Sequence, residues 1–234
     1  MSELKINKKL FQDRKRTNIL SDPEQKLITY LVPKIPSWIS SDMLTGIGTF
    51  GSALILLAFI LAKHIAVEYL LLGILGFMIN WLGDSLDGRL AFYRNKSRRW
   101  YGFSLDIIMD WISTVMIGFG YIIYATGVFE VIGYILVACY GWSMIISQLR
   151  YKVTDKYTID AGFVGPTEIR VIISLVLVLE VVFPGVINYL VAAICAILVF
   201  INFRDTGLLL KMGDVRDMEE RAAKEQQERL KKVD

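Results

Sequence analysis

The chain has 234 residues, of which 54% are hydrophobic, and it carries a formal net charge of only +3. Its mean hydropathy of +0.48 lies well outside the range of ordinary soluble domains. The composition therefore excludes an ordinary soluble domain and predicts an integral membrane protein. Its two cysteines, Cys139 and Cys195, both lie in apolar runs, which excludes a disulfide framework and a cysteine-based zinc site.

The N-terminal part precedes the first long apolar run. Residues 1–21 form a basic tail that we expect to lie in the cytoplasm, and the first 40 residues show no removable signal peptide. Residues 22–40, DPEQKLITYLVPKIPSWIS, combine charged side chains with Leu, Ile, Tyr and Trp. This mixture predicts an interfacial amphipathic helix on the inner leaflet of the membrane.

Long apolar runs follow, each close to the ~20 residues that an α-helix needs to cross the hydrocarbon core. They cover residues 43–62, 66–83, 103–126, 129–149, 169–185 and 186–203. The boundary between the last two depends only on Pro184 and Gly185, which break a helix. We therefore predict an all-α integral membrane protein with six transmembrane helices. Residues 22–205 would form the membrane domain, and residues 206–234 a charged cytoplasmic helix.

Lysine and arginine are distributed very unevenly between the two sides that these runs define. There are 8 before the first run, 5 between the second and third, 4 between the fourth and fifth when Arg170 at the start of the fifth is included, and 8 after the sixth, which leaves Lys63 alone on the opposite side. The positive-inside rule therefore places both termini and the two basic loops in the cytoplasm. Basic residues there suit anionic headgroups or phosphate-bearing substrates, although most of them would be explained by topology alone.

Two other polar residues lie near the opposite side. Glu180 falls near the outer end of the fifth run, and we expect its side chain to snorkel toward the interface. His64 is the only histidine and lies in the first outer loop. Its position argues against histidine-based catalysis on the cytoplasmic side.

Four aspartates lie on either side of the basic turn RNKSRR, between the second and third runs. Asp84 and Asp87 are three residues apart, and Asp106 and Asp110 are four apart, so each pair shares a helix face. Two antiparallel helices would bring the pairs together at their cytoplasmic ends. Four carboxylates so placed need a cation, and oxygen-only ligands select a hard ion such as Mg²⁺, Mn²⁺ or Ca²⁺.

Small residues accompany the acids on the same helix faces. Gly88 and Ala91 lie four and seven residues after Asp84, and Gly102 precedes Asp106 by four. They would leave room for a substrate to approach the backbone. Aspartates that cap helix ends would explain one or two of the four acids but not two matched pairs.

At these residues the chain resembles the CDP-alcohol phosphotransferase family, whose signature is D-x2-D-G-x2-A-R, a variable gap, then G-x3-D-x3-D. Seven of the eight fixed positions agree, at Asp84, Asp87, Gly88, Ala91, Gly102, Asp106 and Asp110. Phe92 stands at the position of the signature arginine, so the role of that arginine would be shifted to Arg94 or Arg89, or lost. The resemblance covers roughly residues 25–205.

The resemblance implies an enzyme of phospholipid biosynthesis that displaces CMP from a CDP-linked donor by an alcohol. By motif position, Asp84, Asp87 and Asp106 would hold Mg²⁺ or Mn²⁺ at the donor's diphosphate. Asp110 would be the general base for the acceptor hydroxyl and would also touch a second metal. The nucleotide-binding residues would be Asp84, Gly88, Ala91, Arg94 and Gly102.

A second basic region is expected to complete the site. Arg150 and Arg170 lie on the same side as the aspartates, and we hypothesise that they bind a phosphate of the donor or acceptor. Gly165 followed by Pro166 predicts the start of a helix, whose N-terminus would be an anion receptor. Basic residues that only mark the ends of membrane spans would explain the pattern equally well.

Alternative functions remain open at this point. CDP-choline or CDP-ethanolamine transfer to a lipid alcohol would use the same motif. An aspartate-rich intramembrane prenyltransferase also binds a diphosphate through metal, and a metal-ion transporter also carries intramembrane acids. The basic loop favours CDP-diacylglycerol as the donor. We expect the CDP-linked donor, an alcohol acceptor, membrane lipids and a second copy in a homodimer as partners, and no nucleic acid.

Overall fold

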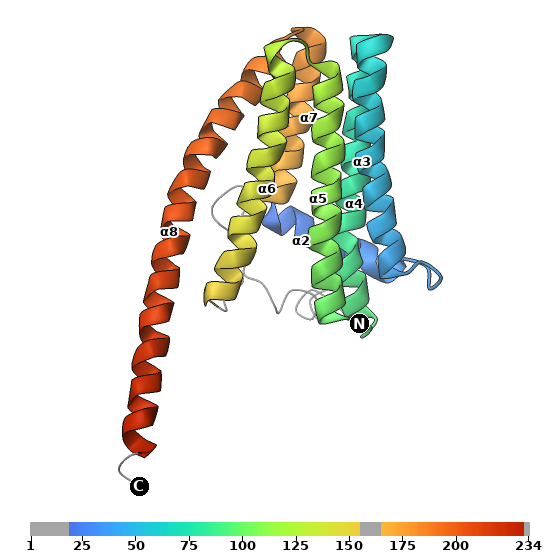
Figure 1. Cartoon of the computed structure of the whole chain (residues 1–234). Coiled ribbons are helices and arrows are strands. Elements are labelled where there is room, and N and C mark those ends of the chain that lie inside the picture. The colour runs from blue at the N-terminus through green and yellow to red at the C-terminus, as the bar shows by residue number, and fades with distance from the viewer. Residues whose placement is uncertain (1–18, 155–164, 232–234) are drawn as a thin grey trace.

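The computed structural model describes residues 19–154 and 165–231, so most of the predicted basic tail lies outside the described residues. Within these ranges every regular element is a helix, and no strand is present. Figure 1 shows the long helices side by side in one bundle. The predicted all-α class is confirmed.

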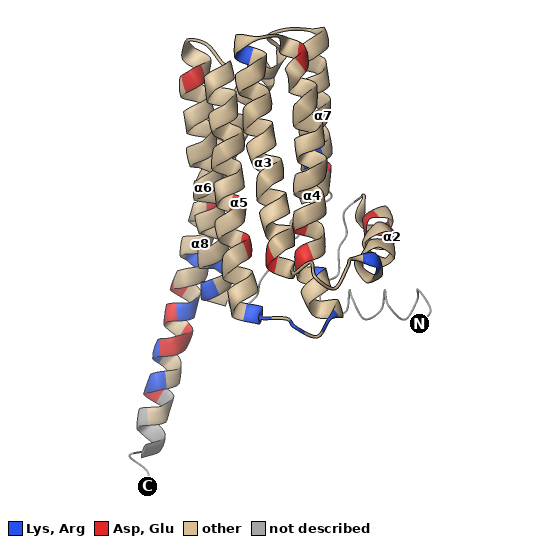
Figure 2. Cartoon of the chain, turned by 90° about the vertical axis from the view of Figure 1, so that its right-hand side faces the viewer, with Lys and Arg blue, Asp and Glu red and all other residues tan. Residues whose placement is uncertain are grey.

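The helix α2 (Ser21–Leu31) and the 3-10 turn η1 (Val32–Lys34) precede the long helices. In Figure 2, α2 lies beside the lower part of α4. Its Ile28 and the following Val32 are each 1% exposed and pack in one cluster with residues of α3 and α4, whereas Leu27 and Tyr30 are exposed. One face is thus buried on the bundle, and a position in the membrane interface stays a prediction.

The long helices follow in chain order. They are α3 (Ser41–His64), α4 (Leu70–Tyr93), α5 (Arg99–Tyr124), α6 (Val128–Thr154), α7 (Pro166–Val182) and α8 (Val186–Lys231), with the 3-10 turn η2 (Val67–Tyr69) before α4. In the described part of the chain, five of them are long and apolar enough to cross a membrane.

The helix that falls short is α7. Its 17 residues rise about 26 Å, less than the ~30 Å of a hydrocarbon core. Pro166 occupies its first position, as predicted, and it ends at Val182, just before Pro184 and Gly185, whose φ is +99°. The predicted break between the last two apolar runs is therefore present, but the count of six transmembrane helices is not confirmed.

The helix α8 joins two elements that the sequence separates. Its 46 residues contain both the last apolar run and the charged segment predicted for residues 206–234, and no proline follows Pro184. Figure 1 shows that α8 continues far beyond the ends of the other helices. In Figure 2 the extension carries alternating basic and acidic residues.

The helices α3 and α4 touch through their backbones. A Cβ added to Gly51 would lie 2.6 Å from the carbonyl oxygen of Gly76, and one added to Gly83 would collide with the backbone of Gly48. Any larger residue at these positions would push the helices apart. Gly83 directly precedes Asp84, so this close crossing determines how far the acidic segment lies from α3.

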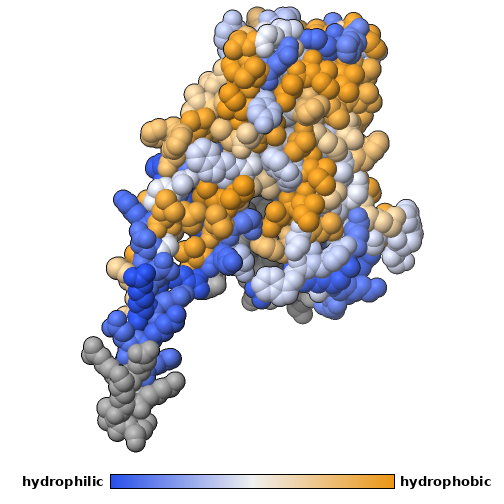
Figure 3. Space-filling view, in the orientation of Figure 1, coloured by the Kyte–Doolittle hydropathy of each residue, from blue (hydrophilic) through white to orange (hydrophobic). Residues whose placement is uncertain are grey.

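The surface divides along the length of the bundle. In Figure 3, hydrophobic residues cover most of the visible upper part, and hydrophilic residues gather at the lower end and along the extension of α8. We call this lower end, where α4 ends and α5 begins, the site end. The apolar surface and the five long helices agree with an integral membrane protein.

The opposite end contains a buried carboxylate. Glu180 is 1% exposed and accepts hydrogen bonds from the Tyr124 hydroxyl at 2.6 Å and from the backbone N–H groups of Gly185 and Ile187, both at 2.8 Å. The prediction that Glu180 snorkels to the surface is wrong. Its carboxylate instead satisfies N–H groups at the start of α8, which have no partner within the helix.

Candidate active site

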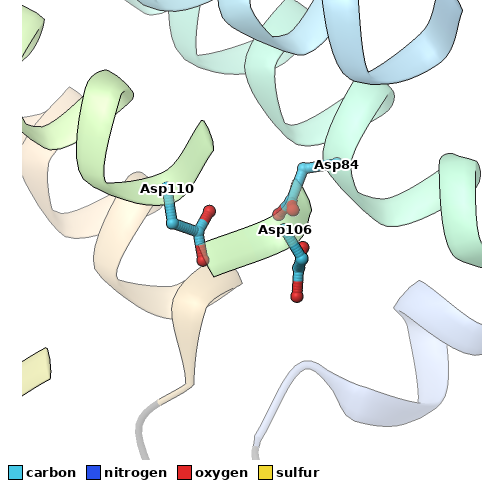
Figure 4. Close-up of side chains that lie close together, drawn as sticks. All are labelled: Asp84, Asp106 and Asp110. Carbon is cyan, nitrogen blue, oxygen red and sulfur yellow. The ribbon is translucent and has the colours of Figure 1, made fainter. Parts of the chain in front are cut away.

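Three carboxylates converge at the site end from two antiparallel helices. Asp84 projects from α4, and Asp106 and Asp110 project from successive turns of α5 (Figure 4). One oxygen atom from each can be chosen so that all three lie within 4.8 Å of one another. These are hard oxygen donors, so the group fits a divalent cation such as Mg²⁺ or Mn²⁺.

The fourth predicted ligand, Asp87, is bound by a neighbouring helix. Its Oδ2 accepts a hydrogen bond of 2.6 Å from the Thr45 hydroxyl of α3, and its Oδ1 accepts one from the backbone N–H of Gly88. The Ser41 hydroxyl donates to the carbonyl oxygen of Asp87 at 2.8 Å. The structure therefore brings three of the four acids together and fixes the orientation of the fourth through α3.

A small cavity of about 20 Å³ lies among these side chains. It has room for about one water-sized species. It is lined by Thr45, Gly48, Thr49, Asn80, Asp84, Asp87, Asp106, Met109, Asp110 and Ser113. All four predicted acids thus face one cavity, although their carboxylates do not all meet in it.

Arg170 reaches this site from the first turns of α7. Its Nη2 donates to Asp84 Oδ2 at 2.6 Å, and its Nε donates to Asn80 Oδ1 at 2.9 Å. Asn80 is 7% exposed and donates from Nδ2 to the Gly48 carbonyl and the Ser52 hydroxyl, at 3.1 and 3.0 Å. These bonds fix the orientation of the amide, which in turn orients the guanidinium of Arg170.

The described contacts of Arg150 lie elsewhere, between α6 and α8. Its Nη2 pairs with Asp205 at 3.3 Å. Its Nε is buried and has no hydrogen-bond partner within the described residues. Of the two predicted phosphate-binding arginines, the structure brings only Arg170 into contact with the acids.

The predicted nucleotide-binding positions differ in their surroundings. A Cβ added to Gly88 or to Gly102 would meet nothing within 4 Å, so open space adjoins the backbone at both positions. Ala91 is half-buried. The two glycines leave the room beside the acids that their spacing predicts.

A protein-family model described as CDP-alcohol phosphatidyltransferase matches residues 38–201, which is more than half of the chain. The chain belongs to this family. Its members are transferases of substituted phosphate groups, so this protein is a membrane enzyme of phospholipid biosynthesis that transfers a substituted phosphate from a CDP-alcohol to an acceptor. Neither the search of curated proteins nor the search of solved structures gave a match.

In this CDP-alcohol phosphatidyltransferase, Arg94 bonds to the segment that connects α2 to α3. Its guanidinium donates to the backbone carbonyls of Ile35, Pro36 and Ile39, at 3.0, 2.8 and 2.5 Å. These contacts join the end of α4 to the segment between α2 and α3. The sequence suggested Arg94 as one substitute for the signature arginine. The described contacts of Arg94 are with this segment and not with the acids.

Arg98 makes a second clamp between the same regions. It donates to both oxygens of Asp42 at the start of α3, at 2.6 and 2.8 Å, and lies 3.8 Å from the ring centre of Tyr101. The hydrogen bond to Asp42 raises the pKa of Arg98 above its usual value. The turn between α4 and α5 is thus tied to α3 on the enzyme's site end.

The sequence motifs did not identify Thr45, which orients Asp87, or Asn80, which orients Arg170. A usable signal was present in the small residues Gly48 and Gly51 of α3 and Gly83 of α4, because small residues at helical spacing in an apolar run mark close helix contacts. Polar residues beside such a contact can bond to the facing helix, as Thr45 and Asn80 do.

A larger groove of about 650 Å³ lies away from the acids, between the last turn of α6 and the extension of α8. Leu208, Met212 and Val215 contribute its apolar wall, and Arg216 donates to the carbonyls of the last turn of α6. No metal-binding group of acids lies in the described lining of this groove.

Proposed function

We propose that this enzyme transfers the phosphatidyl group of CDP-diacylglycerol to a polar alcohol and releases CMP. The observation that carries the proposal is the convergence of Asp84, Asp106 and Asp110 beside Arg170, within the segment that matches the family. Carboxylates for a metal and a guanidinium for a phosphate are the groups that transfer from a diphosphate needs.

We propose that Asp84, Asp87 and Asp106 hold Mg²⁺ or Mn²⁺. When bound, the ion neutralises charge on the diphosphate and on the leaving CMP. The Thr45 hydroxyl and the Gly88 N–H fix the Asp87 carboxylate, and each of its oxygens keeps a lone pair for a ligand bond. Such outer hydrogen bonds orient metal ligands in other proteins.

Asp110 is the proposed general base. Its residue is exposed, unlike the half-buried Asp84 and Asp106, and no described residue donates a hydrogen bond to its carboxylate. It would accept the hydroxyl proton while the alcohol oxygen attacks the lipid-bearing phosphorus. The bond between that phosphorus and the oxygen that bridges it to the second phosphorus then breaks. CMP leaves with the electron pair of the broken bond.

The two arginines and the small residues complete the proposed substrate site. Arg170 would bind a phosphate of the donor, and the nucleotide would pass the open backbone at Gly88 and Gly102. Arg150 is proposed to bind a phosphate of the acceptor, since its buried Nε lacks a partner among the described residues. Arginine is suited to both roles because its fork of N–H groups matches phosphate.

We further propose that both termini and the site face the cytoplasm, because 25 of the 26 basic residues lie on that side. A cysteine placed at Ser97 should react with an impermeant thiol reagent only from the cytoplasmic side, and one at Ala66 only from outside. Reaction of both from the same side would contradict this topology.

The reaction is tested with purified protein in detergent. CDP-diacylglycerol should yield CMP with one of glycerol phosphate, serine, inositol or inositol phosphate, and excess EDTA should stop release reversibly. CDP-choline with diacylglycerol is the comparison for the alternative donor. Turnover of that pair alone would contradict the phosphatidyl donor, and full activity in EDTA would contradict the metal. Light scattering of the same sample tests the proposed homodimer.

A further inference from the structure

Arg170 and a bound metal would both use Asp84. In this structure the Arg170 guanidinium and the Asp84 carboxylate form an ion pair of 2.6 Å, and their side chains are only 16% and 28% exposed. Asp84 also supplies one of the three oxygens that lie within 4.8 Å of one another. Positive charge from the guanidinium therefore already balances part of the charge of the acidic cluster.

The space beside this ion pair is too small for a substrate. The cavity among the acids measures about 20 Å³, whereas small-molecule sites usually measure ≈ 300–1,000 Å³. The Arg170–Asp84 pair links α7 to α4 directly at this cavity. A donor diphosphate that binds here would contact Arg170 at the position that the Asp84 carboxylate occupies in this structure.

The Nε and Nη2 atoms of the Arg170 guanidinium have different partners. Nε bonds to Asn80, and Asn80 is fixed by Gly48 and Ser52 of α3, whereas Nη2 bonds to Asp84. The Nη2 group can therefore exchange one acceptor oxygen for another while Nε stays in place. A phosphate oxygen is an equivalent acceptor for it.

We propose that Arg170 is a positioning residue that changes partner during substrate binding, from Asp84 in the free enzyme to a phosphate oxygen of the CDP-linked donor. The exchange releases Asp84 to the metal. This inference rests on the proposed function, because it requires both a metal at the acids and a diphosphate donor. It follows that donor and metal each tighten the binding of the other, by more than their direct contact supplies.

The experiment measures Mn²⁺ affinity by electron paramagnetic resonance, with purified protein alone and with CDP as the diphosphate probe. The test variant is Arg170→Gln. The matched control is Arg98→Gln, which also removes one arginine from an ion pair with an aspartate, Asp42, but away from the acidic cluster. Cytidine, which lacks phosphate, is the control for CDP.

Without CDP, Arg170→Gln should bind Mn²⁺ about 5-fold or more tightly than the native enzyme, since couplings of this kind are roughly 5- to 150-fold. CDP should tighten Mn²⁺ binding strongly in the native enzyme and in Arg98→Gln, and much less in Arg170→Gln. Loss of the positive charge alone would raise Mn²⁺ affinity equally with and without CDP, so the loss of the CDP effect in Arg170→Gln is the result specific to the exchange. Equal or weaker Mn²⁺ binding by Arg170→Gln without CDP would overturn the exchange.

Two further variants keep the result interpretable. If Arg170→Gln does not fold, Arg170→Lys carries the test, because a lysine lacks the fork that bonds Asn80 and Asp84 together. It should bind Mn²⁺ more tightly than the native enzyme, and equal or weaker binding would overturn the exchange. Asp84→Asn tests the proposed function itself. Native Mn²⁺ affinity in Asp84→Asn would refute the metal site, whereas loss of binding there with no gain in Arg170→Gln would refute only the exchange.

Discussion

The two ends of the bundle both contain carboxylates within long apolar helices, but they satisfy them differently. At one end, Glu180 is 1% exposed and accepts three hydrogen bonds, one from a hydroxyl and two from backbone N–H groups. At the other end, three carboxylates lie within reach of one ion. No described residue donates a hydrogen bond to the carboxylate of Asp110.

This difference separates a structural acid from those that we propose to be reactive. A carboxylate with a full set of protein donors is already stabilised by those hydrogen bonds and gains little from an added cation. Clustered carboxylates repel one another, so they gain from any cation that enters. The count of protein donors around an intramembrane acid is therefore more informative than its mere presence in a span.

The largest expected effect is at the centre of the acidic cluster. Asp106→Asn should abolish CMP release and strongly weaken Mn²⁺ binding, because it removes a charged oxygen ligand of the proposed metal ion. Steady-state CMP release and Mn²⁺ titration measure the two effects. Asp42→Asn, an aspartate at the same end outside the cluster, is the control and should keep Mn²⁺ affinity. Native activity of Asp106→Asn would contradict the distinction between the two ends.

The second effect separates base from ligand. Asp110→Asn should lower turnover by about 10²- to 10⁴-fold, the usual range for a lost general base, and leave donor and metal affinity close to native. Turnover, KM for the donor and Mn²⁺ affinity are measured together. A loss of metal affinity as large as that of Asp84→Asn would instead identify Asp110 as a ligand of a second ion.

The third effect concerns the hydrogen bond that α3 gives to the cluster. Thr45→Val keeps the shape of the side chain and removes the donor to Asp87. Metal affinity should fall by about 10- to 100-fold, as for other outer-shell partners of metal ligands. Thr49→Val is the matched control, since its hydroxyl donates only to the backbone carbonyl of Thr45. Equal effects of the two substitutions would show that the Asp87 bond has no special role.

The smallest effect on catalysis is expected at Glu180. Glu180→Gln should lower stability by roughly 2 kcal/mol, because a charged acceptor of buried N–H groups is lost, and this corresponds to about 4–8 °C in melting temperature. The activity of each folded molecule should stay native. Glu130→Gln, at an exposed residue that accepts one N–H bond from Gly127, should melt nearly as the native enzyme does. A catalytic defect in folded Glu180→Gln would remove the contrast between the ends.

The motif residues could be located from the sequence because their spacing follows helix geometry. Asp84 on one helix, and Asp106 with Asp110 on the next, meet where the spacing and the antiparallel connection predict. The all-α class follows equally from long apolar runs. These features depend on residues close together in the chain or joined by one short turn.

The remaining features depend on contacts between distant segments. The partner of Asp87 lies 42 residues away in Thr45, and the partner of Asn80 is Arg170, 90 residues away. The fate of Glu180 depends on Tyr124, which no local pattern pairs with it. Hydropathy also separated the last apolar run from the charged segment after residue 205. It detects the change of composition there, but the helix α8 continues through it.

The continuity of α8 fixes a distance outside the bundle. From Arg204, where charged residues begin, to Lys231 the helix advances about 40 Å, and no proline interrupts it. The glycines Gly207 and Gly213 are the points at which it would bend most easily. A reporter domain fused after Lys231 would therefore lie far from the acidic cluster. Fluorescence transfer between the two would report the bending of α8 rather than motion in the active site.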